Sequence, residues 1–163
     1  MTASAENNEA NSDVNVSKLR ELALRGKNYR EQVEIEYLGE MLELYVKPLT
    51  DKEFLPIAAF LEDHLDMDAE DAKEKIEAEK KDGDDTSIDP SNFDREFVGI
   101  MQKAAAKGVD TEQGDAAGMA EEDVEETIEM LMGGKSLEIA EKVMDISSDA
   151  EKAEKFRRDG GGQ

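Results

Sequence analysis

Acidic side chains are the most abundant potential metal ligands and acid–base groups in this chain. The sequence contains 42 Asp and Glu residues, 20 Lys and Arg, one His and no Cys. Closely spaced carboxylates suit calcium, but a calcium-binding loop also needs a glycine at its sharp turn and a bidentate Glu at its end. A loop starting at Asp66 ends at Glu77 but has Asp71 in place of the glycine, and a loop starting at Asp82 ends at Phe93. We therefore expect weak, scattered cation binding and no dedicated metal site.

The side chains that could act as bases, nucleophiles or phosphate ligands lack the partners that such chemistry requires. His64 is the single histidine, and its neighbours Asp63 and Asp66 point in other directions on a helix, which favours a surface histidine at a helix end. The segment GGKS at 133–136 resembles the end of a phosphate-binding loop, but the earlier glycine and the leading strand are missing, so we expect a joint between two helices. No Gly-x-Ser-x-Gly pattern marks a catalytic serine. The sequence therefore predicts neither an enzyme nor a cofactor site.

A β-hairpin is the first element that the sequence pattern predicts. Val33, Ile35 and Tyr37 alternate with glutamates, and the same period of two returns over 42–46, which gives one apolar and one acidic face. A glycine at 39 permits the turn, and Pro48 ends the second strand because it cannot donate to the ladder. Because two strands alone are barely stable, the apolar face needs a cover. We expect the next helix, up to residue 65, to supply it.

Helices are predicted over most of the remaining chain. Thr50 and Glu53 form a capping box, and Pro56 is expected to kink the helix that follows. The segment 68–81 has Ile76 as its only large apolar residue, so we expect a helix that is nearly all solvated. Short helices are also expected over 17–26, from Pro90 to 108, over 120–132, over 136–147, and from a second capping box at 148–151.

These elements predict an α+β fold that is mostly α-helical. The N-terminal β-hairpin is expected to pack on a helix, with a small C-terminal helical bundle after it. We divide the chain into a disordered acidic N-terminus (1–16), a short helix with the hairpin and covering helix (17–65), an acidic helix and linker (66–89), a helical block (90–158) and a flexible glycine-rich tail (159–163).

Composition limits the partners of the chain. A net charge of -22 repels phosphate backbones and anionic lipids, so we expect no direct binding to nucleic acid or membranes. Neither a signal peptide nor a long apolar run is visible, which favours a cytoplasmic location. At 1 M salt the Debye length is only about 3 Å, so repulsion between neighbouring carboxylates is screened. Such acidity is therefore typical of proteins from salt-loving microbes or their viruses. An acidic, partly disordered protein from ordinary salt is the alternative.

Two sets of residues are candidates for partner binding. Lys18, Arg20, Arg25, Lys27 and Arg30 form the one locally basic stretch, which is either a solvated helix face or a docking arm for an acidic partner. The second set is the apolar stripe of the helical block, where methionines either fill the core or adapt to a partner. Its members are Phe93, Phe97, Ile100, Met101, Val124, Ile128, Leu131 and Met132.

The hairpin VEIEYLGEMLELYVK, followed by the helix start PLTDKEFLPIAAFLE, resembles the tail assembly chaperones of long-tailed, siphovirus-like viruses. The segment EETIEMLMGGKSLEIAEKVMDISS is similar to the closing helices of that family, so the likeness covers about residues 31–65 and 90–148. The resemblance implies a non-enzymatic protein that binds the tape measure protein, keeps it soluble and promotes polymerisation of tail tube protein around it. It also implies a host-cytoplasmic protein that is absent from the mature virion, with self-association as a further expectation.

The acidic composition suggests that the virus infects a halophilic archaeon. Two other functions stay open on the sequence: a minor structural protein of the virion, at the head–tail joint or tail tip, and an acidic regulator that mimics DNA. A modest core, apolar helix stripes and high net charge suit a protein that binds apolar segments while it stays soluble.

Overall fold

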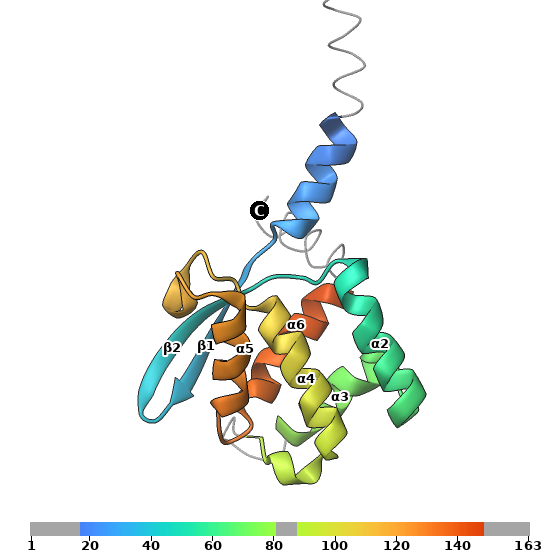
Figure 1. Ribbon diagram of the computed structural model, residues 1–163, viewed down its shortest axis with the longest axis vertical. Coiled ribbons are helices and arrows are strands. Elements are labelled where there is room, and N and C mark those ends of the chain that lie inside the picture. Colours follow the sequence, from blue (N-terminus) through green and yellow to red (C-terminus); the bar gives the residue numbers. More distant parts are fainter. Residues whose placement is uncertain (1–16, 81–87, 149–163) are drawn as a thin grey trace, which may run out of the picture.

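A short hairpin and a set of helices build the protein, which we describe from a computed structural model (Figure 1). The structure describes residues 17–80 and 88–148. A helix over 17–27 comes first. The elements after it are β1 (Glu31–Tyr37), β2 (Glu40–Val46), α2 (Asp51–Leu65), α3 (Ala69–Lys80), the 3-10 turn η1 (Pro90–Asn92), α4 (Arg95–Gly108), the 3-10 turn η2 (Gly114–Ala116), α5 (Glu121–Met130) and α6 (Lys135–Ser148). The predicted α+β, mostly helical fold class is confirmed.

The predicted hairpin forms, with its apolar residues paired across the two strands. Ile35 pairs with Leu42 and Val33 with Leu44, which places the apolar side chains on one face. The turn consists of Leu38 and Gly39, both with positive φ (54° and 81°), as a two-residue turn that follows the strand twist requires. Glutamates occupy the outward positions of β1, so the two faces differ as the alternation predicts.

α6, and not α2, covers the apolar face of the hairpin. α6 packs on β1 and β2 and also on α3 and α4, whereas α2 packs on α4 and α3 (Figure 1). The expectation that the helix after the hairpin covers it was therefore wrong. Alternation defines an apolar face but does not say which helix meets it. α6 has the wider apolar surface, with Leu137, Ile139, Ala140, Val143, Met144 and Ile146 all buried.

α3 belongs to the packed body, although the sequence predicted a solvated helix. Ala72, Lys73 and Ile76 are buried, and the helix lies against α6. Lys73 Nζ lies 3.1 Å from Asp145 Oδ1 and 3.4 Å from Glu70 Oε1. Burial lowers the pKa of Lys73, but the hydrogen bonds and charges of these two carboxylates outweigh burial and raise it above its ordinary value. The aliphatic part of the Lys73 side chain thus packs where an apolar residue would be expected. A pattern of apolar residues in the sequence cannot reveal this.

Glycines allow two close approaches between segments of the chain. α4 ends at Gly108, as predicted, and a side chain there would strike Val143 of α6. Gly133 and Gly134, with φ of 68° and 74°, join α5 to α6, so the GGKS segment is a helix–helix joint. A Cβ at Gly134 would meet the carbonyl oxygen of Ile88, so this joint also fixes the chain that enters η1.

Several helix boundaries agree with the sequence signals and one does not. The Glu53 carboxylate accepts a hydrogen bond from the Thr50 backbone N–H (3.0 Å), and α2 continues through Pro56. His64 is exposed and stacks on Phe60, with 4.3 Å between ring centroids. Pro90 begins only the turn η1, and α4 starts at Arg95 because Phe93 and Asp94 have extended backbone.

Some predictions fall on residues outside the described ranges. These are the acidic N-terminus (1–16), part of the linker (81–87), the helix that follows the second capping box, and the terminal tail (159–163). Within the described parts of the chain, no helix has both the length and the apolar character needed to cross a bilayer.

Candidate functional site

Most residues of the predicted partner-binding stripe lie in the core. Phe93, Phe97, Ile100, Met101, Val124 and Ile128 are each at most 9% exposed. Leu131 is half-buried, and Met132 alone is well exposed, at 63%. In this conformation these six side chains pack mainly against the core and offer a partner little surface, although Ile100 also lines an open hollow beside α4. Small domains use such stripes for their own stability first.

The stripe is also divided between two sides of the molecule. Phe93 and Phe97 stack on each other, with 5.2 Å between ring centroids. Val124, Ile128 and Leu131 instead line a small apolar hollow of about 110 Å³ together with Leu42, Leu44 and Ile139. The α5 part of the stripe thus packs toward the hairpin, away from the α4 aromatics.

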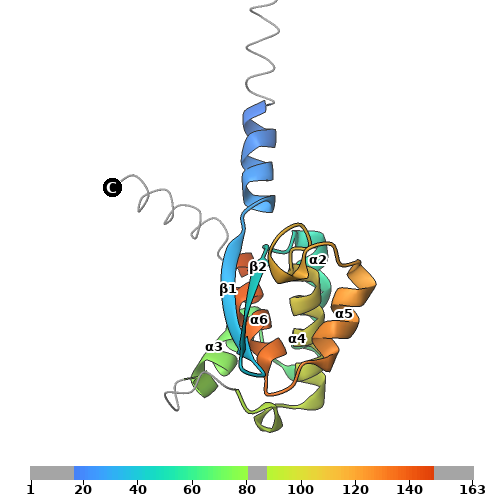
Figure 2. The ribbon, with the colours of Figure 1, turned by 90° about the vertical axis from the view of Figure 1, so that its left-hand side faces the viewer.

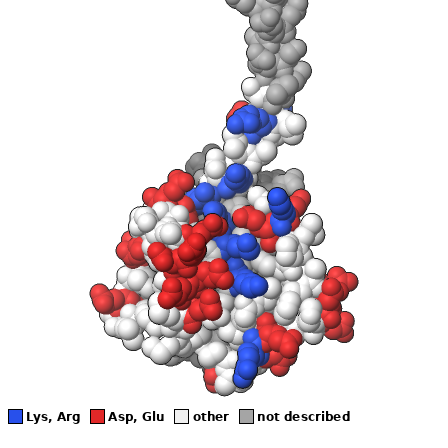
Figure 3. Space-filling view, viewed as in Figure 1, with Lys and Arg blue, Asp and Glu red and all other residues white. Residues whose placement is uncertain are grey.

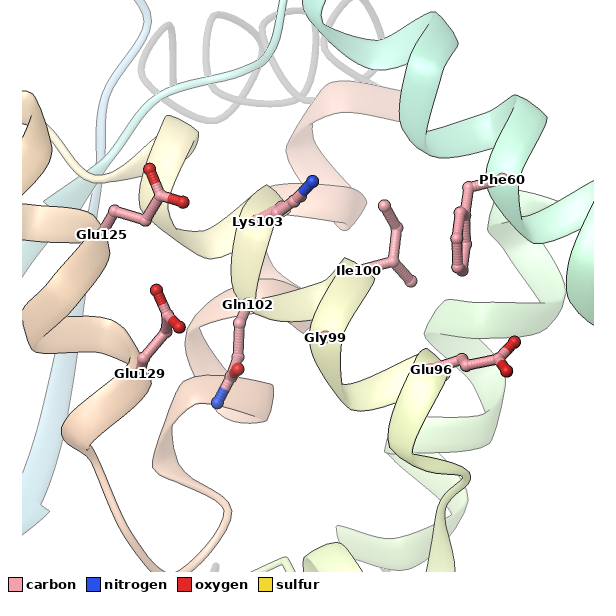
Figure 4. A pocket seen from close by; sticks show the side chains of 8 residues that line it. All are labelled: Phe60, Glu96, Gly99, Ile100, Gln102, Lys103, Glu125 and Glu129. Carbon is pink, nitrogen blue, oxygen red and sulfur yellow. The ribbon is translucent and has the colours of Figure 1, made fainter.

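An open hollow lies on the outward side of α4, between α2 and α5 (Figure 4). It has a volume of about 330 Å³, and its lining residues are Phe60, Glu96, Gly99, Ile100, Gln102, Lys103, Glu125 and Glu129. A second hollow of about 370 Å³ continues along α4 and α5, lined by Lys103, Ala106, Lys107, Glu121, Glu122 and Glu125. Because Lys103 and Glu125 line both hollows, we treat the two hollows as one continuous groove, the α4–α5 groove.

Small residues of α4 open the floor of the groove. Gly99 lies inside a helix, where glycine costs about 1 kcal/mol relative to alanine, yet a Cβ there would meet nothing within 4 Å. Packing therefore does not require this glycine. Its effect is to lower the floor beside Ile100, while Phe60 of α2 forms an aromatic wall on the other side (Figure 4).

The opposite wall is acidic. α5 has the sequence EEDVEETIEM, with Val124 and Ile128 buried and every acidic side chain exposed. Glu121, Glu125 and Glu129 follow one another at intervals of four, so they share the side that faces the groove. Figure 3 shows acidic side chains gathered over α5, beside basic side chains over α4.

Among the described residues, the charged side chains that line the groove form no ion pairs within the fold. Within residues 17–80 and 88–148, the ion pairs include neither the α5 carboxylates nor Lys103 and Lys107. The same ranges contain no group of three or more His, Cys, Asp or Glu placed to hold a metal ion. An open groove with an aromatic wall and an acidic wall can bind an elongated partner that has an apolar stripe and a basic flank.

The groove was not predicted from the sequence, because the predicted binding face consisted of apolar residues only. Of the groove residues, only Ile100 was in the predicted stripe. Two signals pointed to Gly99 and to the glutamates of α5: an isolated glycine inside the α4 pattern, and a helix with six acidic residues in ten and no basic one. Neither signal says that the two helices lie side by side, which only the packing shows.

Comparison of the chain with models of protein families, with curated proteins and with solved structures gives no match. A functional proposal therefore depends on the geometry of the groove and on the sequence resemblance described above.

Proposed function

We propose that this protein is an assembly chaperone that binds an amphipathic helix of its client in the α4–α5 groove. The observation that carries the proposal is the groove itself, with an aromatic wall at Phe60, an opened floor at Gly99 and a wall of carboxylates free of ion pairs among the described residues. Helices commonly bind other proteins by laying an apolar face into such a groove.

The dimensions of the groove support a helical client. Its lining on α4 runs from Glu96 to Lys107, which is about 16 Å at 1.5 Å per residue. A client helix of about three turns matches this length. Its apolar residues would meet Phe60 and Ile100, and lysine or arginine on its flank would meet the carboxylates of α5.

The resemblance to tail assembly chaperones suggests the identity of the client. We propose the tape measure protein, a long, largely helical chain that needs a soluble partner until tail tube protein polymerises around it. The net charge of -22 suits this task, since it keeps a complex with an apolar client in solution. The proposal places the protein in the host cytoplasm and outside the mature virion, without enzymatic activity.

Co-expression with the tape measure protein of the same virus tests the proposal. We expect the wild-type chain to keep the tape measure protein soluble and to elute with it. The double substitution Glu125→Lys and Glu129→Lys should weaken the complex at least 10-fold, because it reverses the charge of the groove wall.

The matched control is the double substitution Asp123→Lys and Glu126→Lys. It changes the net charge equally on the same helix but at exposed residues that do not line the groove. It should leave binding within about 2-fold of wild type. An insoluble tape measure protein, or equal losses for both variants, would overturn the proposal. Mass spectrometry of purified virions separates it from a structural role, because a chaperone is absent from them.

A further inference from the structure

The helix over 17–27 projects from the body of the protein (Figures 1 and 2). Its leucines are open to solvent: Leu19 is 74% exposed, Leu22 48% and Leu24 38%. These three are among the large apolar residues that the described part of the chain leaves exposed. An isolated helix of this length is marginal in water, so a partner that covers its leucines would stabilise it.

This helix has the opposite charge to the rest of the molecule. Four basic residues, Lys18, Arg20, Arg25 and Lys27, stand against one acidic residue, Glu21, which gives it a charge of about +3 in a chain of net charge -22. At 100° per residue, Leu19 and Leu22 form a stripe with basic residues on both of its flanks. A basic helix with exposed leucines complements the α4–α5 groove, which has apolar residues at Phe60 and Ile100 and an acidic wall on α5.

The base of the helix is fixed to the body. Tyr29 is buried, and Arg30 Nε donates to Asp110 Oδ2 at 3.0 Å. Arg30 Nη1 also donates to the carbonyl oxygen of Lys27 at 2.8 Å, and the Asn28 N–H donates to the Leu24 carbonyl at 2.7 Å. To fold back onto its own groove, the helix would have to break the bond between Arg30 and the Lys27 carbonyl, which sets the direction of the helix end relative to β1. Its direction instead presents the leucines to another molecule.

We propose that the helix over 17–27 of one copy docks in the α4–α5 groove of a second copy. Leu19 and Leu22 would pack near Phe60 and Ile100, while basic residues of the helix would face Glu125 and Glu129. The helix has 11 residues, about 16 Å at 1.5 Å per residue, which equals the length of the groove. Each copy offers one such helix and one such groove, so two copies exchange helices reciprocally and close a dimer.

This inference uses the groove but does not depend on the identity of any client. If a client helix also binds there, it displaces the docked helix, so the dimer is the resting form and the client complex holds one copy. The tests below contain this protein alone. Their failure and the failure of the proposed function can therefore be told apart.

The absence of cysteine from the chain allows a direct test by disulfide cross-linking. One preparation carries Leu22→Cys and the other carries Gly99→Cys, where a side chain has open space. After mixing in about 0.3 M NaCl, where charge screening lies between its values at 0.1 M and 1 M, we expect the disulfide-linked pair to form at least 10-fold faster than with a control. The control replaces Leu22→Cys by Leu38→Cys, which is 78% exposed at the hairpin turn.

Charge reversal tests the assigned contact. Adding Glu125→Lys and Glu129→Lys to the Gly99→Cys chain should abolish the rate advantage, whereas Asp123→Lys and Glu126→Lys should preserve it. Adding Lys18→Glu and Arg25→Glu to the Leu22→Cys chain should restore cross-linking to the lysine-bearing groove. Sedimentation of the unmodified full chain should show dimers that become monomers when Leu19 and Leu22 are replaced by serine.

Three results would overturn the proposal. Leu22→Cys could react no faster than Leu38→Cys. A chain carrying both Leu22→Cys and Gly99→Cys could close its disulfide internally, at a rate independent of concentration, which would show docking in its own groove. The unmodified chain could also sediment as a monomer at all concentrations.

Discussion

Asp110 joins three segments of the chain through its carboxylate and its backbone N–H. Its side chain accepts hydrogen bonds from Arg30 Nε, from Gln113 Nε2 and from the Glu112 N–H, each at 3.0 Å. Its backbone N–H donates to the carbonyl oxygen of Tyr45 in β2. Burial raises the pKa of Asp110, but these hydrogen bonds and the Arg30 charge outweigh burial and lower it below its ordinary value. The carboxylate thus ties the base of the N-terminal helix to the end of α4.

A lowered pKa in the folded state makes this carboxylate stabilising above the unfolded value of about 3.9, and the contribution is lost as the pH falls through the folded value. We expect Asp110→Asn to lower the free energy of unfolding by about 1–3 kcal/mol at pH 7, because it leaves Arg30 without its counter-charge. The deficit relative to wild type should shrink below about pH 4. Urea unfolding at pH 7, 5 and 3 measures it.

Asp63→Asn is the control for that experiment, because Asp63 is exposed on α2. It should change the free energy of unfolding by less than about 0.5 kcal/mol at each pH. A deficit for Asp110→Asn that stays constant down to pH 3 would contradict the assigned role of the ionised carboxylate.

Among the elements, α6 decides the packing of the others. Leu42 of β2 and Ile139 of α6 line the same small hollow, whereas Ile57 of α2 is buried on the other side of the body. We expect Leu42→Ala and Ile139→Ala to be non-additive in the free energy of unfolding by at least about 0.5 kcal/mol, because the two substitutions share one cavity. Leu42→Ala and Ile57→Ala should add. Urea denaturation of the single and double variants closes both cycles.

The opposite result would be additive losses for Leu42 with Ile139 and non-additive losses for Leu42 with Ile57. It would indicate that α2 covers the apolar face of the hairpin, as the sequence predicted. The comparison is matched because both partners of Leu42 are buried isoleucines, at 0% and 2% exposure. Any general effect of cavities on stability is therefore common to both cycles.

The elements themselves were largely readable from the sequence, and their partners were not. Period-two alternation, the Thr50–Glu53 capping box and the glycine pair at 133–134 each act over a few residues, so local patterns report them. The cover of the hairpin and the burial of Lys73 depend on contacts such as Lys73 with Asp145, which are 72 residues apart in sequence. The candidate site failed for the same reason, since Gly99 and Glu129 form one groove only after α4 and α5 pack.

At the scale of the whole molecule, the charge is distributed rather than neutralised. Figure 3 shows carboxylates over much of one face, with basic side chains concentrated near α4 and the N-terminal helix. Of 42 acidic residues in the chain, the described ion pairs use only a few. Repulsion among the rest opposes the compact state.

Salt should therefore stabilise the fold. We expect the free energy of unfolding at pH 7 to rise by about 2 kcal/mol or more between 0.1 M and 2 M NaCl, or about 4–8 °C in the unfolding midpoint, because the Debye length falls below 3 Å. At pH 5, closer to the isoelectric point of about 4.3, the rise should be clearly smaller. Thermal unfolding followed by circular dichroism measures both. An equal rise at the two pH values would point to stronger apolar burial in salt rather than to screened repulsion.

The central position of α6 has a consequence for how the protein is made. α6 is the last described helix to leave the ribosome, yet β1, β2, α3 and α4 all rest on it. At about 5–20 residues per second, translation from the end of β2 at Val46 to the end of α6 at Ser148 takes roughly 5–20 s. During that interval the apolar face of the nascent hairpin lacks α6, the helix that covers it. The core therefore closes only after α6 has been made, and a product that stops before Lys135 lacks the helix on which the other elements pack.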